Sequence, residues 1–416
     1  MKAILVSFLT ALITLPALAA RPVEGKFIAH EWGTFTSVQG ADGVQLEWNS
    51  LVASDLPPFV YNLSRIPVNV RSNNLVFLLT KPNLRARQRM ETPVIYLYSD
   101  RERTVDVVVD FPQGQITEWY PQLHADSFKT PGRVHQMKWN DVTLLPRATH
   151  AELEAKLPTH PNPSHYFPAR EANADFLRRT PAPGEKPEIE SLLFYRGVGQ
   201  FPAPLTVTMR ESSRALRLGN SGKEPLGNLF VLEVKRDGGA AFSFIDRIEP
   251  GATRDVSLPC SRSVQPTSDV AKHLGTSMRA ALVREGLFEA EAAAMVKTWR
   301  DSWFAEPGVR VLYTLPREWT DRTLPLRLDP KPMEIVRVMV GRAEVITSAM
   351  ESAVLAQFKR FIGSPADGRA AIARETRDMG LGRFLEPTVL RLKGRVPDQQ
   401  FNTLGFTFLA MTANAR

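Results

Sequence analysis

Residues 104–110 read Thr-Val-Asp-Val-Val-Val-Asp, and this stretch decides the fold class. Val105, Val107 and Val109 stand at every second position, so in an extended backbone their side chains share one face. This alternation is typical of a β-strand with one buried face. Other short β-branched or aromatic runs lie nearby, separated by Pro, Gly, Asn and Asp, and closely spaced strands of this kind predict an antiparallel β-sandwich.

Two β domains are predicted, joined by a proline-rich connection. The first domain covers 20–148, with strands at 26–38, 74–80, 94–98 and 104–111. The second, a small antiparallel domain, covers 189–260, with strands at 205–209, 216–218, 229–234 and 242–248. The connection, 149–188, opens with a short helix at 149–157 behind a Thr149/Glu152 capping box. Its prolines predict irregular backbone for the rest.

The last part, 261–416, is predicted to be α+β. Helices are expected at 268–284, 289–304 and 348–362, and strands at 310–315 and 335–346. In the helix at 289–304, an apolar stripe at helical spacing runs through Ala292, Met295, Val296, Trp299 and Trp303. Ser348 and Glu351 form a capping box, and Ser364-Pro365 predicts the start of a last helix that ends near Gly380. The expected fold class is therefore mainly β with a C-terminal α+β part: antiparallel sandwich-like domains followed by helices and a small sheet.

The N-terminus has the pattern of a cleavable signal peptide. Met1-Lys2 is positive, residues 3–15 are apolar, and Ala17-Leu18-Ala19 suits a signal peptidase. We expect residues 1–19 to be removed and the protein to be exported to the periplasm or the extracellular space. No later stretch is long and apolar enough to predict a transmembrane span in the mature chain.

Composition favours a globular protein without a nucleic-acid surface. The chain is 43% hydrophobic and 23% charged, with a formal net charge of +8. Its basic residues are scattered among acidic ones, which indicates a mixed solvated surface and no nucleic-acid partner. A single cysteine, Cys260, excludes an internal disulfide.

The stretch 30–37, His-Glu-Trp-Gly-Thr-Phe-Thr-Ser, is the most distinctive. In a strand, His30 and Trp32 share one face and Glu31 lies on the other, and Gly33 could mark a bulge or a close backbone approach. His30 could line a cleft as a general base, or bind zinc or copper with His124 and His135. The alternative is a hydrogen-bonded histidine beside a core tryptophan.

Three further sites are candidates. Glu91 and Glu118 could form an acid/base pair, or could be edge carboxylates of a sandwich. The rings of Trp32, Trp119 and Tyr120 could stack on a ligand. Arg196, in Phe-Tyr-Arg-Gly-Val-Gly, could clamp a carboxylate or phosphate, or could bridge two domains.

Together, these motifs and the segments 193–199, 295–304 and 336–344 resemble a family of exported bacterial proteins of unknown function that share the His-Glu-Trp-Gly-Thr-Phe-Thr motif. The resemblance implies export and supplies no mechanism. We expect a non-catalytic periplasmic or cell-surface protein that binds an envelope or extracellular ligand or partner. The alternative is a metal- or carboxylate-dependent hydrolase acting on envelope or extracellular glycan or peptide.

Overall fold

The computed structural model describes residues 25–49, 56–63, 84–129, 133–210, 214–258 and 264–415. The predicted signal peptide 1–19, the predicted strand 74–80 and Cys260 lie outside these ranges. Everything below concerns the described residues.

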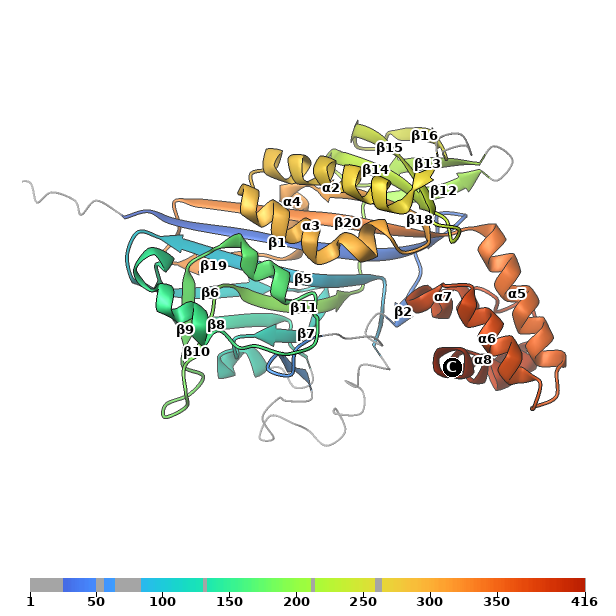
Figure 1. Ribbon diagram of the computed structural model, residues 1–416, viewed down its shortest axis with the longest axis horizontal. Coiled ribbons are helices and arrows are strands. Elements are labelled where there is room, and N and C mark those ends of the chain that lie inside the picture. Colours follow the sequence, from blue (N-terminus) through green and yellow to red (C-terminus); the bar gives the residue numbers. More distant parts are fainter. Residues whose placement is uncertain are drawn as a thin grey trace, which may run out of the picture.

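One ten-stranded sheet runs through the molecule (Figure 1). Its strand order is β17-β15-β14-β18-β20-β1-β5-β11-β7-β3. Every neighbouring pair is antiparallel except β1 and β20, which pair in parallel at its centre. The strands are β1 (Phe27–Gly40), β3 (Tyr61–Asn62), β5 (Gln88–Ser99), β7 (Gly114–Tyr120), β11 (Leu193–Gly199), β14 (Leu226–Val234), β15 (Gly239–Ile248), β17 (Gln265–Pro266), β18 (Gly308–Leu315) and β20 (Glu334–Ile346).

This sheet crosses the predicted domain boundaries. It takes β1, β5 and β7 from 20–148, β11, β14 and β15 from 189–260, and β18 and β20 from 261–416. The mainly β fold class with C-terminal helices is confirmed, and the three segments share one central sheet.

Two smaller sheets cover one face of the large sheet. The five-stranded sheet has the order β10-β9-β8-β6-β19, and the three-stranded sheet has the order β12-β13-β16. Val105, Val107 and Val109 of β6 are fully buried between the layers, as the alternating pattern predicted. The strands are β6 (Arg103–Asp110), β8 (Gln136–Leu145), β9 (Phe176–Arg179), β10 (Glu188–Glu190), β12 (Leu205–Arg210), β13 (Ala215–Asn220), β16 (Thr253–Ser257) and β19 (Leu326–Asp329); β2 (Trp48–Asn49) and β4 (Arg85–Ala86) pair separately.

Helices cover the opposite face, which we call the helical face. Helices α2 (Thr267–Arg284) and α3 (Glu289–Phe304) lie across the sheet in Figure 1, and the 3-10 helix Phe167–Ala172 packs beside α3. Met295, Trp299 and Trp303 are buried against the sheet, which confirms the predicted apolar stripe of this helix. The predicted helix at 149–157 is wrong in type: two 3-10 helices, Arg147–Thr149 and Ala151–Lys156, occupy it, and Thr149 caps neither.

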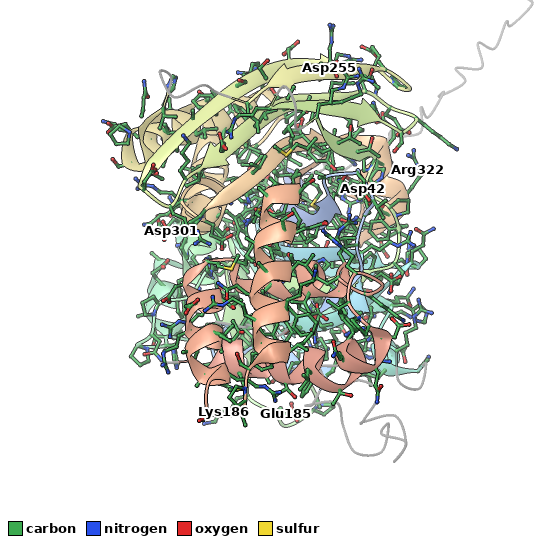
Figure 2. The ribbon with its side chains drawn as sticks, turned by 90° about the vertical axis from the view of Figure 1, so that its right-hand side faces the viewer. Asp42, Glu185, Lys186, Asp255, Asp301 and Arg322 are labelled. Atoms are coloured by element: carbon green, nitrogen blue, oxygen red, sulfur yellow. The ribbon has the colours of Figure 1, made fainter. Side chains whose placement is uncertain are left out.

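Four C-terminal helices form a separate cluster with its own apolar core. Figure 2 views the molecule from their side, where they stand in front of the sheets. They are α5 (Ser348–Gly363), α6 (Arg369–Asp378), α7 (Leu385–Leu390) and α8 (Asp398–Asn414), and α4 (Arg317–Thr323) lies apart from them. The N-cap of α5 is Thr347, not Ser348, and α6 begins at Arg369 because the residues after Ser364-Pro365 form a turn.

Candidate functional site

His30 ties the sheet to helix α3. Its Nδ1 lies 2.7 Å from Oε2 of Glu291, and the other oxygen of Glu291 accepts a hydrogen bond from the Tyr98 hydroxyl at 2.6 Å. Glu291 Oε2 also accepts the backbone N–H of Phe288, which satisfies one free donor at the start of α3. His30 and Glu291 are 1% and 0% exposed. The geometry matches a hydrogen-bonded histidine between two packed elements.

The histidines considered as metal ligands do not meet. Within the described ranges, no group of three or more His, Cys, Asp and Glu side chains could hold a metal ion. His124 instead accepts the backbone N–H of Asp126 at 3.2 Å and caps the 3-10 helix Ala125–Phe128. The described residues therefore do not form the zinc or copper site proposed for His30, His124 and His135.

The aromatic side chains considered for ligand stacking lie inside the protein. Trp32 and Trp119 are 0% exposed, and Tyr120 is 5% exposed. Trp119 donates its indole N–H to Gln122 Oε1 at 2.7 Å. Burial, and then the nearby charge of Glu188, raises the pKa of Tyr120 well above its ordinary value. These rings belong to the two apolar cores and offer no exposed stacking surface.

Gly33 does mark a close approach. Strand β5 carries an extra residue opposite it, between the pairs Trp32–Val94 and Thr34–Glu91. A Cβ on Gly33 would lie 3.0 Å from both the Met339 sulfur and the Pro93 Cα. The bulge on β5 is where Thr92 has φ +48°, and it turns Glu91 and Arg89 onto the helical face.

Beyond this bulge the helical face becomes charged, and we call this region the charged belt. Strand register places it: Thr36 of β1 pairs with Arg89 on one side and Arg342 on the other, and Glu118 of β7 pairs with Arg196 of β11. The belt consists of Arg89, Arg196, Arg310, Arg342 and Arg383, with Glu91, Glu118, Glu306 and Glu344.

One half of the belt is balanced in charge. Glu344 accepts hydrogen bonds from Arg310 Nε at 3.0 Å and from Arg342 Nη2 at 2.8 Å. Arg342 Nη2 also donates to Glu306 at 2.7 Å. Burial alone would lower the pKa of Arg342, but the charges of Glu344 and Glu306 raise it above its ordinary value. Two arginines thus face two glutamates here.

The other half carries an excess of positive charge. Glu91 lies 3.1 Å from Arg89 Nε, accepts Thr36 Oγ1 at 2.9 Å, and accepts Arg383 Nη1. Burial alone would raise the pKa of Glu91, but the charges of Arg383, Arg89 and the other arginines hold it well below its ordinary value. Burial lowers the pKa of Arg89 to about 10. With Arg196, three arginines here face Glu91 and Glu118.

Arg196 and Arg383 each keep two buried N–H groups without a partner in the described part of the chain. Arg196 is 2% exposed and donates Nη2 to Thr92 Oγ1 at 3.3 Å, but its Nε and Nη1 have no acceptor. Arg383 Nε and Nη2, which form one edge of the guanidinium, also lack one. A buried N–H without an acceptor costs about 1–3 kcal/mol, and such an edge suits an oxyanion. The belt around Arg196 and Arg383 is the candidate site.

Of these residues, sequence reasoning had singled out Arg196, Glu91 and Glu118 but missed Arg89, Arg342 and Arg383. A usable signal existed in two strands. Arg89/Glu91 and Arg342/Glu344 are charged pairs two positions apart inside apolar strands, so each pair shares one strand face. For Arg383, in a short 3-10 helix before α7, the sequence pattern offers no such signal.

Glu91 does not have the character of a general acid. A general acid needs a carboxyl whose pKa is raised towards neutrality, whereas the pKa of Glu91 is lowered. Its side chain is 1% exposed and bound by arginine and threonine. The arrangement is suited to holding an anion rather than to proton transfer.

No protein-family model and no curated protein matches this chain. Among solved structures, the chain is similar to the yeast delta-COP-I mu-homology domain, determined alone and in complex with a Dsl1 WxWxV peptide. Sequence identity is 7% and 8%, the TM-score is 0.30 for both, and each match covers 78% of this chain and 98% of that chain. A TM-score this low carries no conclusion about fold or function.

None of the described helices is both long enough and apolar enough to cross a membrane.

Proposed function

We propose that this protein is an exported, non-catalytic binding protein whose ligand carries an anionic group held by Arg196 and Arg383. The observation that carries the proposal is the set of buried guanidinium N–H groups of Arg196 and Arg383 for which the described residues provide no acceptor. Native proteins rarely leave such groups unsatisfied, and a carboxylate, sulfate or phosphate group would supply the missing acceptors.

The position of the site supports a ligand that bridges two parts of the fold. Arg196 comes from the central sheet, whereas Arg383 comes from the 3-10 helix Gly382–Phe384, directly before α7 in the C-terminal helices. Both guanidinium groups act on the charges of Glu91 and Arg89, so both belong to the same charged cluster. An anion held by both would accept hydrogen bonds from an arginine of the sheet and from an arginine of the C-terminal helices.

Thermal unfolding with inorganic phosphate and sulfate, at ionic strength matched with chloride, tests this proposal. A ligand that binds only the folded state stabilises it, by about 2.7 kcal/mol at one hundred times its Kd. We expect a saturable rise in Tm for the mature protein. Arg196→Gln and Arg383→Gln should each lose the saturable part, and Arg217→Gln, at an exposed ion pair with Asp255, should keep it.

Phosphate and sulfate also stabilise proteins without binding, by exclusion from the surface. This contribution grows steadily with concentration and is the same in every variant. A Tm rise of equal size and shape in wild type, Arg196→Gln and Arg383→Gln would therefore overturn the proposed anion site.

Export is part of the proposal and rests on the N-terminal pattern of residues 1–19 and on the family resemblance. Expression of the full chain in a Gram-negative host, followed by fractionation and N-terminal sequencing, tests it. We expect the mature chain to begin at Ala20 and to leave the cytoplasm. A cytoplasmic protein that still contains residues 1–19 would contradict export without affecting the anion site.

A further inference from the structure

A pocket lies between the sheet and the C-terminal helices. It has a volume of about 480 Å³ and is lined by the end of β14, the following turn, the start of β18, the start of α5 and the residues after α6. This volume is in the range of small-molecule sites, which often form where two packed units meet.

Part of the pocket lining is apolar and adaptable. Val234, Val309 and Leu381 are almost fully buried, at 4%, 5% and 5% exposed. Met350 and Met379 are half-buried and line the same space. Methionine side chains are flexible and polarisable, so they can pack against apolar groups of varied shape.

The charged lining residues leave one positive charge available. Glu233 accepts two hydrogen bonds from Arg214 at 2.7 and 2.9 Å, and Asp237 accepts the backbone N–H of Gly239 at 3.0 Å. Arg236 donates to the Asp378 carbonyl at 2.9 Å. Lys235 donates its backbone N–H to the Gly239 carbonyl at 2.7 Å, but among the described residues its side-chain ammonium has no hydrogen bond or ion pair and can meet a ligand.

We propose that this pocket binds a small free amphiphile, an alkyl or aryl carboxylate, with its apolar body against the methionines and its carboxylate near Lys235. The apolar lining favours burial of the tail, and the unpaired ammonium favours a negative over a neutral or positive head group. The lining of this pocket includes neither Arg196 nor Arg383, the residues of the proposed anion site.

Isothermal titration calorimetry of the mature protein with decanoate, below micelle formation, tests the proposal. We expect saturable binding that Lys235→Gln weakens about fivefold, the effect of one partly exposed charge contact. Met379→Gln should weaken it as well, and Lys272→Gln, on the exposed side of α2, should not. Decanol and acetate, which each lack one half of the amphiphile, should bind more weakly than decanoate.

Two controls keep the outcome unambiguous. Thermal unfolding shows whether Lys235→Gln and Met379→Gln fold as wild type does, and decanoate binding to Arg196→Gln separates this pocket from the charged belt. The proposal is overturned by no saturable binding to wild type, by binding that neither pocket variant weakens, or by decanol binding as tightly as decanoate. It is also overturned if Arg196→Gln, rather than the pocket variants, removes binding.

Discussion

Arg383 donates a hydrogen bond through Nη1 to Oε1 of Glu91, a residue 292 positions earlier in the chain. Glu91 belongs to β5 near the centre of the sheet, and Arg383 belongs to the 3-10 helix before α7. The neighbouring residue Phe384 packs on Trp48 with ring centroids 5.8 Å apart. One ionic and one apolar contact thus hold the C-terminal helices against the sheet at this point.

Arg383→Gln should lower the free energy of unfolding by about 2 kcal/mol, because it removes a buried charge partner of Glu91. The loss should be smaller than for a fully buried pair, since the Arg383 side chain is 18% exposed and Arg89 still neutralises Glu91. Urea unfolding measures it. Arg360→Gln, at an exposed ion pair with Glu375 in the same helical cluster, should unfold close to wild type. Equal behaviour of the two variants would argue against the role given to Arg383.

Glu91→Gln should change how stability depends on pH. The pKa of Glu91 is depressed in the folded state, so its ionisation stabilises the fold above the unfolded pKa of about 4.3, and this contribution is lost as pH falls towards the folded pKa. We expect the variant to be about 3 kcal/mol less stable than wild type at pH 7. The gap should narrow steadily below about pH 4 in urea unfolding. A gap that stays constant down to pH 2 would contradict a depressed pKa.

His30→Ala should act on stability. The variant leaves one oxygen of the fully buried Glu291 without its side-chain partner and opens a cavity beneath α3, so we expect a loss of about 3 kcal/mol. Chemical unfolding measures the loss, with exposed His273→Ala as the control that should change little. Addition of zinc should not change the difference in free energy of unfolding between wild type and His30→Ala. If zinc stabilised wild type but not His30→Ala, this result would support a role for His30 as a metal ligand.

Thr347→Ala and Ser348→Ala form a matched pair at the start of α5. Thr347 Oγ1 accepts the backbone N–H of Met350 at 3.1 Å, so its removal should cost about 1 kcal/mol, as for other N-caps. Ser348, which the sequence pattern indicated as the cap, is already inside the helix, where alanine is the more favourable residue. In thermal unfolding, Ser348→Ala should therefore have a higher Tm than Thr347→Ala. The reverse order would support Ser348 as the N-cap, as the sequence pattern predicted.

Local patterns predicted the elements well because their causes are local. The alternation of Val105, Val107 and Val109, and the apolar stripe through Trp299 and Trp303, each follow from the period of one element. Pairing across long stretches of chain could not be predicted in this way. Nothing near β1 indicates that its partner is β20, so segments that looked like separate domains share one sheet.

The charged belt was hard to predict for a related reason. Arginine is usually exposed, so a single sequence gives a buried guanidinium no distinctive pattern. Arg196 was selected for its neighbouring glycines, whereas its actual environment depends on Thr92, 104 residues away, and on the bulge in β5. The strands of the central sheet bring the side chains of this site together only in their observed register, and that register is set by tertiary packing.

The parallel pair at the centre of the sheet also constrains the order of folding. Glu31 of β1 is bound by Arg337 of β20, 306 residues later, at 2.6 Å. Strand β1 therefore emerges from the ribosome long before its partner is synthesised, and the central sheet cannot close until most of the chain exists. Contacts this distant in sequence make folding slow. A nascent chain with this topology stays open for most of its synthesis, which gives a translocation or chaperone machinery time to engage it before the native sheet forms.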